Sequence, residues 1–202
     1  MQSPTPLTRD LVLIGGGHTH ALVLRMWGMK PLPGARLTLI SPDPVTAYSG
    51  MLPGFVAGHY PREALDIDLV RLARHAGARL ILGRVEGIDR PSRKVRVAGR
   101  PPIGYDVLSI DIGISSDMPA LPGFFDHAVA AKPLDVFASR WGAFVAGGAG
   151  RRVAVIGGGV AGVELALAAT ERLGPGAEVT IIEANKALSA VSRASARARL
   201  AW

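Results

Sequence analysis

The sequence predicts an α/β fold with two Rossmann-like dinucleotide-binding units, the second of them truncated. The chain repeats itself, and each repeat begins with an apolar strand followed by a glycine-rich turn. The segment 11–17 (LVLIGGG) returns as 153–159 (VAVIGGG), and 37–41 (LTLIS) returns as 179–183 (VTIIE), both at an offset of 142 residues. A chance glycine run would not preserve the spacing to a second strand. We therefore interpret each repeat as the start of a βαβ unit.

Composition excludes several classes of protein. The 202 residues include no cysteine, so the chain has no disulfide, thiolate zinc site, iron–sulfur cluster or cysteine redox pair. An oxidoreductase with this sequence must carry its electrons on a bound cofactor. The net charge is +7, but no acidic residue follows Glu183 while four basic residues do, so much of the excess belongs to the tail. With only 5% aromatic residues, nucleic-acid binding is not expected.

The second repeat has the complete glycine pattern. Gly157 permits a tight turn, Gly159 lets the backbone approach a pyrophosphate, and Gly162 lets the following helix pack close to the strand. The helix is expected to continue over 163–169. Glu183 ends the next strand, where a carboxylate can accept hydrogen bonds from ribose hydroxyls. Its charge would repel a 2′-phosphate, which favours NAD(H) over NADP(H).

The first repeat departs from this pattern at two positions. Gly15, Gly16 and Gly17 form its turn, but His20 stands where the third glycine is expected and Ser41 stands where the acid is expected. A histidine cannot give the same close contact, so the helix should pack differently. Ser41 offers a weaker, neutral hydrogen bond, and Asp43 is the nearest acid that could compensate. The pair His18 and His20 lacks the further ligands of a metal site, so we interpret both as lining the turn or the helix surface.

The remaining elements follow in order along the chain. The segment 42–54 is rich in turn formers and is expected to be irregular, near the carboxyl edge of the sheet where ligands bind. An amphipathic helix over 67–75 and a strand over 79–85 come next. A turn at 89–94 leads into a hairpin strand, and a further strand over 105–113 ends in glycine. A helix is expected over 133–145. No apolar run is long enough to span a bilayer, and no secretory signal is visible.

These motifs resemble the pyridine nucleotide–disulfide oxidoreductase superfamily, flavoproteins with two dinucleotide-binding domains. The resemblance is carried by the turn 15–17, the strand 105–113 and the segment 157–164 (GGGVAGVE). Within the superfamily the chain is most similar to type-II NADH dehydrogenases and sulfide:quinone reductases. The segments 15–20 (GGGHTH), 48–54 (YSGMLPG) and 58–60 (GHY) resemble an NADH-dehydrogenase-like flavoprotein fused to selenide, water dikinase in some bacteria. No segment resembles the kinase itself.

The resemblance implies how the chain is divided. Residues 1–125 would be the N-terminal segment of an FAD-binding domain, 126–150 a connecting helix and linker, and 151–202 the N-terminal half of an NAD(H)-binding domain. A complete nucleotide domain needs at least one more parallel strand. We therefore expect the chain to be a fragment that is inactive alone.

The resemblance also implies site residues. The stretch 111–113 (DIG) looks like the family's Ala-Thr-Gly motif beside FAD, although its first two residues differ from that motif and only Gly113 matches it. Glu164 matches a position near the nicotinamide. Ser49-Gly50-Met51 looks like the Cys-Gly-Met of single-cysteine NADH oxidases, and serine cannot form a sulfenate. The expected cofactor-binding residues are Gly15, Gly16, Gly17, His18, Thr19, Ser41, Pro42, Asp43, Ser49, Gly50, Met51, Val85, Asp111, Gly113, Gly157, Gly159, Val160, Gly162, Glu164 and Glu183.

These expectations combine into one function. The complete protein is expected to be an FAD-dependent oxidoreductase that passes hydride from NADH to FAD and on to a quinone-like or other small acceptor. No side chain needs to act as a nucleophile or general base, so no catalytic residue is named, and no metal is expected. A fused or associated selenide, water dikinase and a cytoplasmic location, peripheral to the inner membrane, complete the expectation.

Two alternatives remain open. The chain could be a regulatory module that senses NADH or the flavin state for a fused selenium-metabolism enzyme, which the departures at His20 and Ser41 favour. It could also be a flavin monooxygenase or amine oxidase, although these usually lack so complete a second glycine fingerprint.

Overall fold

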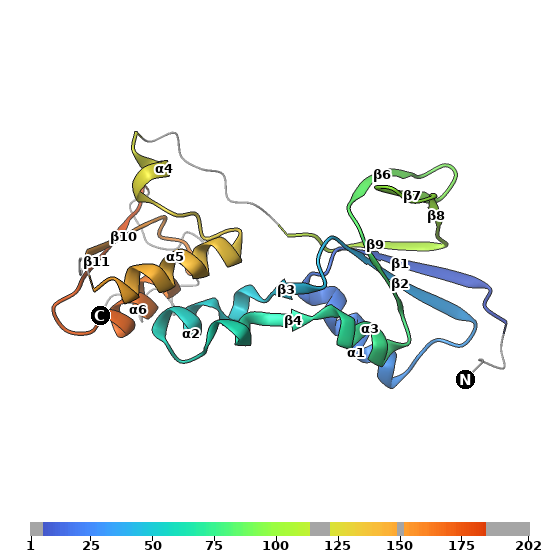
Figure 1. Cartoon of the computed structure of the whole chain (residues 1–202), viewed down its shortest axis with the longest axis horizontal. Coiled ribbons are helices and arrows are strands. Elements are labelled where there is room, and N and C mark those ends of the chain that lie inside the picture. The colour runs from blue at the N-terminus through green and yellow to red at the C-terminus, as the bar shows by residue number, and fades with distance from the viewer. Residues whose placement is uncertain (1–5, 114–121, 149–151, 185–202) are drawn as a thin grey trace. The chain divides into compact units, whose positions relative to one another are not determined.

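The computed structural model describes residues 6–113, 122–148 and 152–184 (Figure 1). The chain divides into two compact units. Unit 1 comprises Met1–Tyr48 and Asp66–Ile114, and unit 2 comprises Ser49–Leu65 and Ser115–Trp202. Each unit contains one of the two sequence repeats. Ser49–Leu65 belongs to unit 2 although it lies within the predicted FAD-binding segment 1–125.

A parallel sheet forms the centre of unit 1. Its strand order is β5-β2-β1-β9, with β1 at Arg9–Ile14, β2 at Ala35–Ser41, β5 at Arg79–Leu82 and β9 at Val107–Ile110. Leu11 pairs with Leu37 and Ile14 with Ile40, so β1 and β2 run in parallel. A parallel pair needs a crossover connection, which α1 (His18–Met29) provides. The βαβ unit predicted from the first repeat is confirmed.

Both faces of this sheet are covered, which explains why its strands are apolar on both sides. One face packs against α1 and α3 (Leu69–Ala76) around Leu13, Leu24 and Leu39. The other face packs against the antiparallel sheet of β6 (Val85–Asp89), β7 (Lys94–Val97) and β8 (Ile103–Gly104). Figure 1 shows the two helices on one side of the parallel strands and β6, β7 and β8 on the other.

Two expectations about unit 1 are wrong in detail. The strand predicted over 79–85 is two strands, because the Gly83 N–H donates to the Ser41 carbonyl at 2.9 Å and the chain then leaves the parallel sheet. The helix predicted over 67–75 begins only at Leu69. The Asp68 side chain caps this helix by accepting a hydrogen bond from the Arg71 N–H at 2.9 Å, and Asp66–Asp68 forms the short strand β4.

The segment predicted to be irregular, 42–54, contains regular structure. Its first part forms β3 (Val45–Ala47), which pairs antiparallel with β4. A 3-10 turn, η1 (Ser49–Met51), follows and leads into α2 (Leu52–Ala57). The prediction is wrong because β3 is stabilised by a partner strand distant in sequence, which local turn signals do not reveal.

Unit 2 contains the second repeat. β10 (Arg152–Ile156) and β11 (Glu178–Ile182) pair in parallel, with Val153 opposite Val179, and α6 (Val160–Leu173) connects them. The second predicted βαβ unit is therefore confirmed, with a helix longer at both ends than expected. Two more helices, α4 (Phe124–His127) and α5 (Leu134–Ala146), precede it, and η2 (Arg62–Leu65) follows α2. The buried Trp141 indole N–H donates to the Val56 carbonyl at 3.2 Å, which ties α5 to α2.

Candidate dinucleotide-binding sites

The two glycine turns have the same backbone geometry. In unit 1 the Gly15 N–H donates to the Ile40 carbonyl at 2.8 Å, and in unit 2 the Gly157 N–H donates to the Ile182 carbonyl, also at 2.8 Å. Gly15 has φ of 92° and Gly157 has φ of 108°, values that L side chains rarely adopt. Both turns therefore require glycine at their first position. Donor and acceptor of the second hydrogen bond each lie 142 residues after their counterparts in the first, the same offset that separates the two sequence repeats.

The second turn leaves space for a phosphate. A Cβ atom added at Gly157 or at Gly159 would meet nothing within 4 Å among the described residues. Gly159 precedes the first residue of α6, whose initial N–H groups have no partner within the helix. These N–H groups and the positive end of the helix dipole favour an anion at this place. The backbone can thus approach a pyrophosphate without a side chain intervening.

The third glycine of this turn serves packing. A Cβ at Gly162 would collide with the Gly157 carbonyl oxygen. The start of α6 therefore lies directly against the turn, as the glycine pattern predicts.

Glu183 reaches back to the same turn from the end of β11. Its Oε2 accepts a hydrogen bond from the Gly158 N–H at 2.6 Å. The carboxylate is therefore held beside the glycines, within the element where the sequence predicts ribose recognition. Glu164, by contrast, lies exposed on α6, and Val160 is exposed at the beginning of that helix.

In unit 1, His20 takes the place of the third glycine. Its ring is 1% exposed, with Nδ1 2.7 Å from the Gly15 carbonyl oxygen and Nε2 2.9 Å from the Ser109 hydroxyl. A carbonyl can only accept, so Nδ1 carries a proton, and in the neutral ring with this tautomer Nε2 accepts from the Ser109 hydroxyl. The imidazole thus occupies the gap between turn, helix and β9. The glycine pattern does not point to Ser109, and the one sequence signal for such a partner is a polar residue within an apolar strand.

Asp111 completes the first turn. Its carbonyl accepts from the Gly17 N–H at 3.2 Å, and its carboxylate Oδ2 accepts from the His20 N–H at 3.1 Å. Gly17 at the N-cap has no side chain of its own, so Asp111 caps α1 from a strand distant in sequence. A Cβ at Gly17 would collide with this carboxylate. The sequence points to Asp111 as a neighbour of the cofactor, but not as a cap.

The other predicted residues of unit 1 differ in their surroundings. Ser41 is 4% exposed at the end of β2, whereas Pro42 and Asp43 are exposed immediately after it. His18 and Thr19 are exposed in the first turn of α1, and the His18 ring lies 5.6 Å from that of Tyr48. Gly113 is exposed three residues after β9. These residues all follow the carboxyl ends of β1, β2 and β9, the edge where ligands bind in open α/β sheets.

Two groups of predicted residues belong to other elements. Val85 begins β6 and packs against the apolar cluster around Val12 and Ile81. Ser49, Gly50 and Met51 form η1, which is grouped with unit 2 and not with the first glycine turn. Among the described residues, no group of three or more His, Asp or Glu side chains could hold a metal ion.

Comparison with known proteins identifies the family. The sequence profile of the pyridine nucleotide-disulphide oxidoreductases matches residues 9–201. The chain belongs to this family. The matched residues, 9–201, include both glycine turns, which agrees with their shared geometry.

Several named proteins are similar over much of the chain. A probable ferredoxin reductase, CtmF, from Castellaniella defragrans is 28% identical over 185 residues, covering 90% of this chain and 44% of the relative. The NADH dehydrogenase-like protein YutJ from Bacillus subtilis is 28% identical, and the match covers 78% of this chain and 44% of YutJ. Demethylphylloquinone reductase NdbB from Synechocystis is 30% identical, and the match covers 61% of this chain and 32% of NdbB. The chain therefore spans less than half the length of these relatives.

Solved structures support the fold. Reduced CoADR-RHD from Bacillus anthracis superposes with a TM-score of 0.76 at 21% identity, covering 95% of this chain and 36% of that one. The ferredoxin reductase of the CYP199A2 system from Rhodopseudomonas palustris gives 0.74 at 21% identity, covering 95% and 46%. The predicted α/β class with Rossmann-like dinucleotide-binding units is confirmed.

The family is defined in part by the cofactors that its members bind. Members of this family bind FAD and NAD(H), as the sequence predicts. The residues present fit a dinucleotide, because the second turn offers open space at two glycines and a carboxylate beside them. Within the described residues, no helix is both long and apolar enough to cross a membrane.

Proposed function

We propose that the full-length protein is an FAD-dependent NADH oxidoreductase in which unit 1 holds FAD and unit 2 holds NADH. The observation that carries this proposal is the pair of matched glycine turns, each closed by a 2.8 Å hydrogen bond to the end of the neighbouring strand. One chain with two such turns suits the binding of two dinucleotides. Transfer between two dinucleotides is the chemistry for which such a pair is used.

Unit 2 provides the residues for NADH. The N–H groups at the start of α6, beyond Gly159, bind the pyrophosphate, and Glu183 accepts hydrogen bonds from the ribose hydroxyls. The same carboxylate repels a 2′-phosphate, which favours NADH over NADPH. Its hydrogen bond to Gly158 holds it in position before the nucleotide arrives.

Unit 1 provides the residues for FAD. The turn of Gly15, Gly16 and Gly17 and the N–H groups of His18 and Thr19 bind the pyrophosphate, since Asp111 already accepts from the N–H groups of Gly17 and His20. Ser41 offers a neutral hydrogen bond to the ribose. FAD, when bound, supplies the group that accepts a hydride and passes electrons on. The chain contains no cysteine, so no thiol of these 202 residues takes part. The chain's own contribution is binding and orientation.

We further propose a quinone-like or other small molecule as electron acceptor. One relative is named a demethylphylloquinone reductase and another a probable ferredoxin reductase, so ferredoxin is the competing acceptor. The resemblance of the segments 15–20, 48–54 and 58–60 supports the association with selenide, water dikinase in a cytoplasmic protein peripheral to the inner membrane. These finer assignments stay predictions.

Purification of the full-length protein tests the proposal. We expect bound FAD, identified after release by heat, and NADH oxidation that depends on an added quinone analogue. NADH oxidation that depends on oxidised ferredoxin, with none when quinones are added instead, would replace the acceptor but keep the reaction. A colourless protein that FAD cannot reconstitute would overturn the proposal.

A regulatory module is the second candidate. The Asp111 carboxylate at the start of α1 and His20 in place of a glycine both distinguish the first turn from the second. Such a module would bind the nucleotides without turnover. Tight NADH binding with no oxidation in the presence of several acceptors would favour it.

A further inference from the structure

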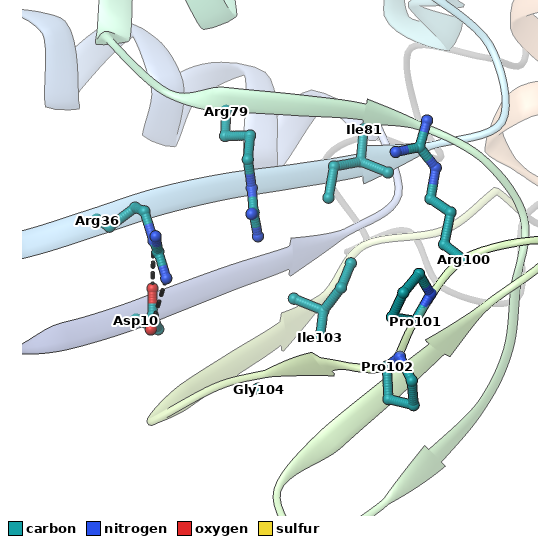
Figure 2. Close-up of a pocket in the computed structure, with 9 residues that line it drawn as sticks. All are labelled: Asp10, Arg36, Arg79, Ile81, Arg100, Pro101, Pro102, Ile103 and Gly104. Carbon is teal, nitrogen blue, oxygen red and sulfur yellow. Dashed lines mark hydrogen bonds and ion pairs between the residues drawn. The ribbon is translucent and has the colours of Figure 1, made fainter.

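A basic cavity lies in unit 1, at the opposite edge of the parallel sheet from the glycine turn. It has a volume of about 370 Å³ and is open to solvent (Figure 2). Its charged walls are Asp10, Arg36, Arg79 and Arg100, and its apolar walls include Ile81 and Ile103. We call these residues, with the prolines between Arg100 and Ile103, the arginine pocket.

The strand pattern explains why these charges gather. Side chains two residues apart on a strand share one face of the sheet, so Asp10 shares the face of Val12, and Arg79 that of Ile81. This face is the one that β6, β7 and β8 cover. Asp10 and Arg79 lie at the beginnings of β1 and β5, beyond the apolar cluster. The core therefore ends in a charged rim at the amino edge of the sheet.

Arg36 and Asp10 neutralise each other. The Arg36 Nε lies 2.6 Å from Asp10 Oδ1, and its Nη2 lies 3.0 Å from Oδ2. By accepting these hydrogen bonds, the Asp10 carboxylate raises the pKa of the Arg36 guanidinium. Figure 2 shows this pair across the two adjacent strands. The fork fixes Arg36 at the cavity wall.

The other two arginines have no such partner. In the described parts of the chain, neither Arg79 nor Arg100 forms an ion pair with an acidic side chain. Both line the same cavity, which consequently has a net charge of +2. Like charges facing one cavity repel each other, and a bound anion would relieve that repulsion.

We propose that the arginine pocket binds an organic phosphate monoester, at a site separate from both dinucleotide turns. A phosphate monoester carries about −1.5 to −2 charges at pH 7 on one group, which matches the pocket's charge. Its oxygens can accept the paired N–H donors of a guanidinium group. Ile81, Ile103 and the prolines offer an apolar surface to the organic part. The volume is at the lower end of the ~300–1000 Å³ range of small-molecule sites.

Isothermal titration of the full-length protein with phenyl phosphate tests the proposal. Saturating FAD and NAD⁺ are present throughout, so that the glycine turns are filled. We expect phenyl phosphate to bind at least about tenfold more tightly than phenol or inorganic phosphate, since only the ester uses both the charged and the apolar walls. Equal affinity for phenyl phosphate and inorganic phosphate would overturn the role of the apolar wall.

Matched variants locate the site. The double variant R79Q/R100Q should weaken phenyl phosphate binding by about tenfold or more. Arg90→Gln, an exposed arginine in the turn between β6 and β7, removes a charge outside the pocket and should leave binding within about twofold. Retained FAD content and an unchanged circular dichroism spectrum show that each variant is folded. Equal weakening in all variants, or no binding in the unchanged protein, would contradict the proposal. Tighter binding of the dicarboxylate succinate than of phenyl phosphate would also contradict it.

Discussion

The His20 imidazole and the Gly15 carbonyl are joined across the first glycine turn, with Nδ1 2.7 Å from the oxygen. The corresponding carbonyl of the second turn, that of Gly157, lies so close to α6 that a Cβ at Gly162 would collide with it. The two repeats thus have the same backbone turn, but the following helix contacts that turn in a different way in each repeat. A buried hydrogen-bonded side chain in unit 1 replaces the direct backbone contact of unit 2.

The contact at Gly162 predicts that Gly162→Ala destabilises unit 2. Forcing a methyl group into this contact should lower the free energy of unfolding by about 1–3 kcal/mol, measured by urea denaturation. Gly159→Ala is the matched control, because a Cβ there meets nothing within 4 Å. This control should keep its stability but bind NADH more weakly, since the methyl group stands where the pyrophosphate approaches. Equal stability of the two variants would contradict the close helix contact.

The buried imidazole predicts that His20→Ala destabilises unit 1. Removing it leaves the buried Gly15 carbonyl without its partner, which should cost about 1–3 kcal/mol, whereas the exposed Ser109 hydroxyl can bond to water instead. Chemical denaturation measures the loss. His18→Ala, two residues earlier and exposed, should change the unfolding free energy by less than about 0.5 kcal/mol. A similar loss in both variants would show that the histidine bonds have no special role.

The Asp111 carboxylate predicts opposite effects on stability and on FAD binding. Asp111→Ala removes the cap of α1 and should cost about 0.5–2 kcal/mol. Asp111→Asn keeps an acceptor for the His20 N–H but loses the charge, so it should be more stable than the alanine variant. Both should bind FAD more tightly, because a negative charge at the start of α1 opposes the pyrophosphate. Fluorescence titration with FAD checks this, and weaker binding in Asp111→Asn would contradict the argument.

The position of Glu183 predicts a selective loss of NADH. Glu183→Ala in the full-length protein should weaken NADH binding by about tenfold or more, which corresponds to ~1.4 kcal/mol, and should leave the FAD content unchanged. Glu183→Gln should reduce the discrimination against NADPH, since it removes the charge that repels a 2′-phosphate. Titration calorimetry with NADH and NADPH measures both effects. Equal loss of FAD and NADH would refute the assignment of the two units.

Local patterns located the elements that are stabilised within one repeat. Leu11 to Gly17 and their counterparts at 153–159 predicted both turns, and the structure adds the matched bonds from Gly15 to Ile40 and from Gly157 to Ile182. Local sequence patterns did not predict the elements whose bounds depend on a hydrogen-bonding partner distant in sequence. β3 is a strand because β4 pairs with it, and the strand after Arg79 ends early because Gly83 bonds to Ser41.

Strand period, glycine spacing and the position of the acid are local properties of the chain, so they are enough to predict the two βαβ units, their glycine turns and the carboxylate at Glu183. Other relationships depend on how distant segments pack. Asp111 caps α1, Ser109 and Gly15 hold His20, and three arginines from different segments line one cavity. These relationships join residues up to 91 positions apart. Their geometry depends on strand order and on which sheet covers which face, and neither is encoded in any single segment.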